Sequence, residues 1–389
     1  MGQFSFNLPV KIHFGTGKAS EIGKIVAKYG KTAMMVTRPW TGVQKAAFER
    51  VRALVEAEGV KVIVFDKVTP NPTTYAINEG TLIAKGENVD VLLGVGGGSS
   101  IDAAKAIAVA ATHPGPAWDY VYTSSKTADP AITLPIIAVT TTSGTGSHVT
   151  KYSVFSNPDV KVKSTIVNEA VFPKESIVDP ELCTTMPAFV TGTTGFDAFA
   201  HAFESYTNIN ANPFIDSIAL QAIQLIVENL EKAVKDPENV EVREKMCYAD
   251  TLAGISIANV GTTLPHSMGQ PISGKCPWVS HGQSLTLVYP EFIRLTQASC
   301  QQKFAVVARM MDPALKDKSD AEAAAQLNGL IIDWQKRLGI YTSLEEMKVP
   351  MEEIEGLTAD AMACPDTYVN PAVPTAEQVR EMFMNMWSK

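Results

Sequence analysis

The chain has 389 residues, 46% of them hydrophobic and 19% charged, which excludes a disordered protein and favours two domains rather than one. Its net charge of −8 and pI of about 5.4 argue against a nucleic-acid partner, because phosphate binding needs a positive face. The N-terminus does not resemble a signal peptide, no apolar run approaches the roughly 20 residues that span a bilayer, and five scattered cysteines without a CxxC motif indicate a reducing cytoplasm.

Short apolar runs alternate with helical stretches through the first half of the chain. The predicted strands cover 33–37, 61–66, 90–100 and 135–142, and the third of them runs into glycines. The predicted helices between them cover 41–58, 74–86 and 99–112. Buried strands that alternate with helices favour a parallel sheet covered on both faces. Over 150–178, β-rich alternation with turn signals predicts a hairpin insertion.

After about residue 185 the strand-like runs vanish and helical periodicity dominates. The predicted helices there cover 187–208, 213–236, 240–260, 280–298, 300–310, 319–338 and 375–388. Prolines punctuate 179–187, so we predict a doubly wound α/β domain at 1–185 and an all-helical domain at 186–389. A cleft between the two halves is the expected ligand site.

The glycine-rich stretch GVGGGSSIDAAKA (94–106) follows a predicted strand and opens a predicted helix. Its glycines let a phosphate approach the backbone, and the helix N-terminus offers oriented N–H groups. The stretch is close to the dinucleotide-binding pattern GxGxxG, with Ser99 in the third glycine position. A tight β–α turn capped by Ser99 or Ser100 is the alternative interpretation.

A second polar turn, TTTSGTGS (140–147), also follows an apolar strand. Two such turns at the ends of strands in one sheet predict a nucleotide-binding crevice beside those ends. At the end of the first predicted strand, Arg38 stands where nucleotide-binding sheets often carry an acidic residue that holds the ribose. A cation tolerates a 2′-phosphate, so Arg38 favours NADP over NAD, unless it is simply a solvated surface residue.

Asp197, His201 and Glu204 share one face of a predicted helix, because they are spaced i, i+4 and i+7. His266 and His281, two of only six histidines in the chain, join Asp197 and His201 as candidate metal ligands. One carboxylate and three imidazoles suit a divalent cation held between neighbouring helices. On spacing alone, three unrelated core or surface histidines remain the alternative.

Taken together, these stretches resemble the iron-containing alcohol dehydrogenase family (group III) over nearly the whole chain. The resemblance rests on GGGSSIDAAKA, TTSGTGS, VDPELCTTMP, TGTTGFDAFAHAFESY, GTTLPHSMGQPI and SHGQSLTLVYP. The last four motifs, in this order and spacing, are highly specific. The resemblance implies a dinucleotide-binding α/β domain followed by an all-helical metal domain, the dehydroquinate-synthase-like architecture, in a homodimer or larger homo-oligomer.

The resemblance also implies the site residues. The metal ligands, which are also the catalytic residues, would be Asp197, His201, His266 and His281, with Fe²⁺ expected and Zn²⁺ compatible with the same donors. Besides Arg38, the implied cofactor contacts are Gly96, Gly97, Gly98, Ser99, Asp102, Thr141, Thr142, Thr145, Lys163 and Leu182. Glu204 is not a family ligand, and its expected role is hydrogen bonding to a ligand or a helix–helix contact.

The sequence departs from the family pattern at three positions. Members commonly carry Asp at the position of Arg38, where it favours NAD, and many carry Glu at the position of His148. Some carry a further histidine, used in proton transfer, where this chain has Gln270. A glutamine cannot act as a general base near neutral pH, so the proton route differs from theirs.

These parts predict a metal-dependent, NAD(P)-linked alcohol dehydrogenase or aldehyde reductase acting on short-chain substrates. The metal would polarise the substrate oxygen, and hydride would pass between the substrate carbon and the nicotinamide ring. A dehydroquinate-synthase-like lyase is the alternative from another reaction class, but it would need a basic phosphate pocket and 186–300 is poor in Lys and Arg around the candidate ligands. Another polyol or hydroxy-compound dehydrogenase of the same architecture also fits. A non-enzymatic nucleotide- or metal-binding module would leave the joint presence of both sets of residues unexplained.

Overall fold

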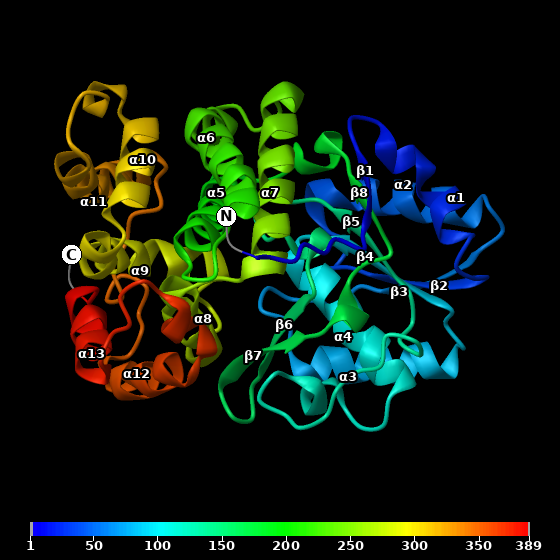
Figure 1. The fold of residues 1–389 in the computed structure, drawn as a ribbon. Coiled ribbons are helices and arrows are strands. Elements are labelled where there is room, and N and C mark those ends of the chain that lie inside the picture. The colour runs from blue at the N-terminus through cyan, green and yellow to red at the C-terminus, as the bar shows by residue number, and fades with distance from the viewer. Residues whose placement is uncertain (1–2, 388–389) are drawn as a thin grey trace. The chain divides into compact units, whose positions relative to one another are not determined.

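The computed structural model describes residues 3–387, which form two compact units (Figure 1). Asn7–Met186 and Pro237–Cys247 make up the first, which we call the α/β unit. Residues 3–6, Pro187–Asp236 and residues 248–387 make up the second, which we call the helical unit. No helix among the described residues is long and apolar enough to cross a membrane.

A six-stranded sheet with the order β1-β8-β5-β4-β2-β3 forms the centre of the α/β unit, and every neighbouring pair in it is parallel. Its strands are β1 (Lys11–Phe14), β2 (Thr32–Val36), β3 (Lys61–Phe65), β4 (Val91–Gly96), β5 (Ile136–Thr140) and β8 (Glu175–Val178). The parallel sheet predicted from the apolar runs is therefore confirmed. Strand β1 was not among the predicted strands, since the alternation of the N-terminal stretch carries no buried apolar run.

Helices cover both faces of this sheet (Figure 1). They are α1 (Ile22–Val26), α2 (Lys45–Glu56), α3 (Thr74–Gly86) and α4 (Gly98–Thr112). Successive residues of β2 point to opposite faces, so Ala33 and Met35 join the core under α1 and α2, whereas Met34 joins the core under α3 and α4. Burial on both faces explains why β4 carries no polar side chain at all.

The hairpin predicted over 150–178 is correct only in its first part. Strands β6 (Tyr152–Asn157) and β7 (Val162–Val167) form an antiparallel pair, but β8 belongs to the parallel sheet between β1 and β5. The polar residue Glu175 makes β8 hard to recognise as a buried strand. Its carboxylate is nevertheless buried, with hydrogen bonds to His13 Nε2 at 2.6 Å and to Tyr29 Oη at 3.0 Å. A short strand with a paired internal carboxylate does not show the apolar run of a buried strand.

The helical unit contains no strand among the residues described. Its helices are α5 (Ala188–Thr207), α6 (Pro213–Lys235), α8 (Leu264–Lys275), α9 (His281–Thr296), α10 (Gln301–Met311), α11 (Asp320–Arg337), α12 (Ile354–Ala363) and α13 (Ala376–Asn385). The remaining long helix, α7 (Val240–Val260), has its first residues in the α/β unit and the rest in the helical unit. Helices α8 and α12 were not predicted, and α8 carries one of the candidate ligands, His266.

A fully buried lysine joins α4 to the segment that precedes the hairpin. Lys105 Nζ donates to the carbonyl oxygens of Ser147 at 2.8 Å, Thr150 at 3.0 Å and Tyr152 at 2.7 Å, and lies 3.8 Å from Asp102 Oδ1. Burial lowers the pKa of Lys105 to about 8, against the opposing effect of Asp102. The lysine thus donates to three carbonyl oxygens within residues 147–152.

Replacing this lysine by an apolar residue of similar length should destabilise the α/β unit. Lys105→Met removes the lysine donor from two buried carbonyl groups and one part-buried carbonyl group, and each buried group left without a donor costs about 1–3 kcal/mol. We expect a loss of about 2–4 kcal/mol in the free energy of unfolding, measured by denaturant titration, once partial relaxation is allowed for. Lys85→Met on the exposed side of α3 removes the same charge and should change stability little; equal effects of the two variants would contradict the assigned role.

Candidate active site

Four side chains from three helices converge inside the helical unit. Asp197 and His201 lie one turn apart on α5, His266 lies on the first turn of α8, and His281 is the first residue of α9. One ligand atom from each residue lies within 4.8 Å of those of the other three. The structure therefore brings together all four residues that the sequence suggested as metal ligands.

The distances within this cluster fit a shared cation. Asp197 Oδ1 lies 3.4 Å from His201 Nε2, 3.7 Å from His266 Nε2 and 3.8 Å from His281 Nε2. These separations are too long for good hydrogen bonds. Donors about 2.1 Å from one ion lie roughly 3.4 Å apart in a tetrahedral arrangement. Asp197 Oδ1 and His266 Nε2 are buried without a hydrogen-bond partner among the described residues, which a cation between them would remedy.

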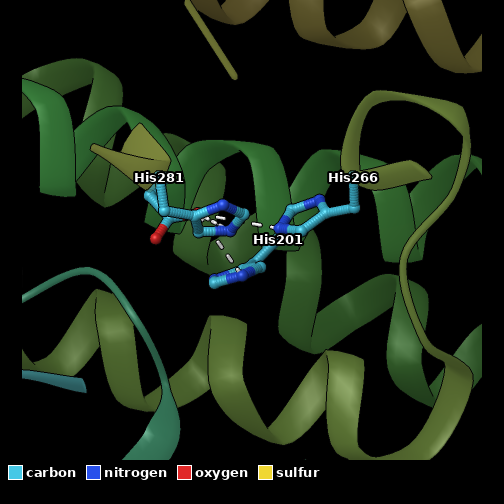
Figure 2. Close-up of side chains that lie close together, drawn as sticks. His201, His266 and His281 are labelled. Carbon is cyan, nitrogen blue, oxygen red and sulfur yellow. Dashed lines mark ion pairs between the residues drawn. The ribbon is translucent and has the colours of Figure 1, made fainter. Parts of the chain in front are cut away.

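The three imidazole rings point toward one another from different helices (Figure 2). The rings of His201 and His266 are stacked with centroids 4.8 Å apart, and the ring of His281 meets that of His266 edge-on at 5.2 Å. The side chain of His281 is 25% exposed, against 3–6% for the side chains of Asp197, His201 and His266. His281 is thus the most exposed of the four side chains.

Helix α5 holds its two candidate ligands rigidly because most of its surface is buried. The aromatic rings of Phe196, Phe199 and Phe203 pack against Tyr289 on α9, at centroid distances of 5.0–6.3 Å. Tyr289 Oη also donates to the Ala200 carbonyl oxygen at 3.3 Å. An aromatic face and a ligand face on one helix explain the mixed composition of this segment, and the packing limits movement of the ligand pair.

The electrostatics of the cluster favour an ionised aspartate. Burial alone would raise the pKa of Asp197, but His201, His281 and His266 outweigh burial and hold that pKa well below its usual range. Glu204, one turn beyond His201, accepts a hydrogen bond from Thr263 N at 2.8 Å and lies 2.8 Å from His266 Nδ1. Glu204 therefore has both of the roles expected for it, because it contacts a candidate ligand and joins α5 to α8.

A close contact between α9 and α5 orients His281. Ser280 and Gln283 form a capping box at the start of α9, which fixes the first turn. Gly282 in that turn approaches α5 so closely that a Cβ atom on it would lie 2.4 Å from the Thr193 carbonyl oxygen. Only glycine allows this approach, and the approach determines how far His281 reaches into the cluster.

In the α/β unit, the two polar turns predicted to bind a nucleotide lie against each other. A Cβ atom on Gly97 would lie 3.0 Å from Thr142 Cγ2, and one on Gly98 would lie 2.9 Å from Thr145 Oγ1. Gly96, with φ of 147°, adopts a conformation that favours glycine, and its carbonyl oxygen accepts from Thr141 N at 3.0 Å. Residues 96–99 and 141–145 thus form one continuous polar surface at the ends of β4 and β5.

Two hydroxyl groups on this surface lack a protein partner. Thr141 Oγ1 and Thr142 Oγ1 are both buried and without a hydrogen bond among the described residues. Buried hydroxyls are normally hydrogen-bonded, so this pair indicates that a polar ligand completes the site. Helix α4 begins beside them with Gly97 as its N-cap and no side-chain cap, which leaves its first N–H groups available to a phosphate.

The remaining predicted cofactor residues differ in their surroundings. Arg38 is exposed, two residues beyond the end of β2, and Lys163 on β7 donates to Asn71 Oδ1 at 3.0 Å. Leu182 is buried in the core under α1 and α2. Asp102 accepts from Ser147 Oγ at 2.6 Å and Val154 N at 3.2 Å, so its carboxylate is occupied in holding α4 to the segment before the hairpin.

Two positions that depart from the family pattern are also informative. His148 is fully buried, and burial together with Lys105 lowers its pKa to about 3, so it is neutral near neutral pH. Gln270 lies on α8 one turn beyond His266 and is half-buried. Near neutral pH neither side chain carries a charge, at the two positions where an ionisable group was expected in many family members (His148) or in some (Gln270).

Two family models together match most of the chain. The model of the iron-containing alcohol dehydrogenase matches residues 9–180. The model of the C-terminal region of the Fe-containing alcohol dehydrogenase family matches residues 191–387. The two matched regions contain the polar turns and the four-residue cluster respectively.

Individual proteins are similar over almost their entire length. The NAD-dependent methanol dehydrogenase of Bacillus methanolicus is 34% identical over 385 residues, which cover 98% of this chain and 99% of that protein. The 1,3-propanediol dehydrogenase of Klebsiella pneumoniae is 32% identical over 382 residues and 98% of each chain. Among solved structures, an archaeal halo-thermophilic alcohol dehydrogenase from a Red Sea brine pool superposes with a TM-score of 0.93 at 35% identity, covering 99% of each chain.

The contact at Gly282 can be tested by adding one methyl group. Gly282→Ala should push α9 away from the Thr193 carbonyl, cost about 1–3 kcal/mol of stability through overpacking, and withdraw His281 from the cluster. We expect a lower unfolding temperature and faster loss of added Zn²⁺ to a chelator. Gly329→Ala on α11 meets no atom within 4 Å and is the matched control. A Gly282→Ala protein that keeps metal as well as this control would contradict the role of the close contact.

Proposed function

Because the chain belongs to the iron-containing alcohol dehydrogenase family, we propose that the four-residue cluster of Asp197, His201, His266 and His281 holds its divalent metal. The chain is an NAD-linked alcohol dehydrogenase, as its family and its relatives of almost equal length indicate. We further propose that the polar surface formed by 96–99 and 141–145 binds the NAD.

One observation supports the metal proposal above all others. A single carboxylate oxygen is surrounded by three imidazole nitrogens at 3.4–3.8 Å, in a buried cluster built from three helices. Unrelated histidines in a core would each be expected to have a hydrogen-bond partner, yet His266 Nε2 has none among the described residues. When bound, the divalent metal supplies a Lewis acid that favours loss of the alcohol proton, and NAD supplies the hydride acceptor.

The protein's own groups bind and orient. Asp197 carries the one negative charge among the four donors, and α5 holds it in fixed register with His201. His281 is the ligand on the exposed side, so substrate approaches the cluster past this residue. The N-terminus of α4 would hold the pyrophosphate of the nucleotide, and the hydroxyls of Thr141 and Thr142 would donate to its oxygens or to a ribose.

The finer assignments follow from donor chemistry and from the relatives. Three imidazoles and a carboxylate accept both Fe²⁺ and Zn²⁺; we propose Fe²⁺ because the family is iron-containing. Short-chain alcohols and the corresponding aldehydes are the proposed substrates, since the relatives are named for methanol and 1,3-propanediol. A homo-oligomer in a reducing cytoplasm completes the proposal, and none of the five cysteines, all of them among the described residues, forms a disulfide.

Metal removal tests the reaction directly. The purified protein should oxidise short primary alcohols with NAD⁺, lose this activity on dialysis against a chelator, and regain it when Fe²⁺ is added without oxygen. The His266→Ala variant, measured beside it, should retain no metal by elemental analysis and should not respond to Fe²⁺. Full turnover by the metal-free protein would refute a catalytic metal at this cluster. A panel of alcohols and aldehydes in the same assay defines the substrate range.

Arg38 tests the choice between the two nicotinamide cofactors. An arginine at the end of β2 accommodates a 2′-phosphate, whereas an aspartate repels it and can bind the ribose hydroxyls. Arg38→Asp should lower kcat/KM for NADP relative to NAD by about tenfold or more, equivalent to roughly 1.4 kcal/mol. Lys85→Asp makes the same charge change on α3 and should leave the ratio unaltered. An unchanged ratio in Arg38→Asp would show that this side chain does not contact the 2′-phosphate.

A further inference from the structure

Glu204 is a buried carboxylate whose two oxygens are both engaged. Oε2 accepts a hydrogen bond from the backbone N–H of Thr263 at 2.8 Å, and Oε1 lies 2.8 Å from His266 Nδ1. The side chain is completely buried, so water does not substitute for either partner. Glu204 thus connects α5, which carries two of the proposed ligands, to the first turn of α8, which carries a third.

These contacts determine which nitrogen of His266 carries the proton. A backbone N–H can only donate, so Glu204 must accept from Thr263, and an ionised carboxylate also accepts at its other oxygen. His266 then donates from Nδ1, and its Nε2 lone pair faces Asp197 Oδ1 at 3.7 Å. Nε2 is the atom that would bind a metal, and it has no hydrogen-bond partner among the described residues.

We propose that Glu204 is a positioning residue that holds His266 in its metal-binding tautomer and thereby slows release of the metal. This inference rests on the proposed metal site and concerns a residue that is not itself a ligand. The carboxylate acts through the imidazole, because a hydrogen bond from Nδ1–H to a charged acceptor strengthens Nε2 as a donor and fixes the plane of the ring.

The isosteric amide makes this proposal testable. In Glu204→Gln the amide oxygen must still accept from Thr263 N, because the amide nitrogen would oppose one N–H with another. The NH₂ group then faces His266 Nδ1 and requires it to be an acceptor, which moves the histidine proton to Nε2. The variant preserves the size of the side chain and the link between the helices, but it selects the tautomer that cannot bind metal.

The experiment uses the full-length protein loaded with Zn²⁺ and measures metal release into excess chromophoric chelator. Release from Glu204→Gln should be about 10–100-fold faster than from the wild type. Glu204→Asp keeps an acceptor-only carboxylate and should release Zn²⁺ more slowly than Glu204→Gln, although aspartate disturbs the packing more. Glu291→Gln is the matched control, since Glu291 is also buried in the helical unit but bonds to Arg294 and Asn385.

Two further measurements distinguish selection of the His266 tautomer by Glu204 from a purely structural role in which Glu204 only holds α5 and α8 together. Unfolding temperatures of the metal-free proteins should be similar for Glu204→Gln and Glu291→Gln; a drop confined to Glu204→Gln that accounts for the faster release would overturn the proposal. With ¹⁵N-labelled histidine, only six residues contribute signals. The zinc-loaded wild type should show His266 protonated at Nδ1, with a downfield N–H resonance that weakens or shifts upfield in Glu204→Gln.

These outcomes also distinguish the role of Glu204 from the proposed metal site on which that role depends. If His266→Ala releases Zn²⁺ as slowly as the wild type, the cluster is not the metal site and both proposals fail. If His266→Ala loses the metal but Glu204→Gln retains it as the wild type does, the metal site stands and the role of Glu204 is refuted. Rapid release from both variants, with slower release from Glu204→Asp than from Glu204→Gln, supports both.

Discussion

The helical unit depends on one electrostatic constraint, which is the buried oxygen of Asp197 facing three imidazole nitrogens. A carboxylate taken out of water is costly unless it is paired and hydrogen-bonded, and Oδ1 has no hydrogen bond among the described residues. The three nitrogens lie 3.4–3.8 Å from this oxygen, too far for good hydrogen bonds. A divalent cation resolves the mismatch, because it accepts a lone pair from every one of these atoms. Without that cation, the arrangement would leave several polar atoms uncompensated in the interior.

The surrounding architecture holds the four donors against this tendency to relax. Phenylalanines of α5 pack on Tyr289, so that α5 and α9 share an aromatic core behind the ligand face. Gly282 allows the same two helices to touch at backbone distance, and Glu204 ties α5 to α8. Helix α5 is therefore linked to both of the other helices that carry candidate ligands, to α9 by apolar packing and close backbone contact and to α8 by a hydrogen bond. Preorganisation of this kind lowers the cost of assembling a metal site.

The α/β unit differs from the helical unit, since the nucleotide proposed for it would be bound by backbone and hydroxyl groups rather than by ionised side chains. Its charged groups nearest the turns, Asp102 and Lys105, are occupied internally and hold α4 to residues 147–154. They stabilise the segment from which the second polar turn extends. The groups left to bind the proposed nucleotide are neutral donors, namely the N–H groups at the start of α4 and the hydroxyls of Thr141 and Thr142. Neutral donors suit a pyrophosphate whose charge is already favoured by the helix N-terminus.

An element of the fold could be predicted from the sequence where its local residue pattern matched its role in the folded structure, and not where the two differed. Strands such as β4 are apolar because both faces are buried, so their pattern was sufficient. The ligand pair on α5 was visible because a helix face fixes the i, i+4 spacing of its residues. Helix α8 was not predicted, because Pro265, Gly269 and Pro271 within twelve residues contradict helix propensity. Pro265 is acceptable because it lies in the first turn of the helix. Gly269 lies close to α9, since a Cβ atom on it would be 3.0 Å from Ser284 Oγ.

The place of β8 in the sheet and the identity of the partners of Glu204 could not be derived from local patterns, for the same reason. Each is a polar feature whose meaning depends on a partner more than fifty positions away, as Glu175 depends on His13 and Glu204 on Thr263 and His266. No local pattern encodes such a pairing, and burial of a carboxylate cannot be inferred until its partners are known. Metal ligands can be recognised from sequence because their chemistry restricts the residue types. The groups that orient those ligands are restricted by geometry alone, and geometry exists only in the folded chain.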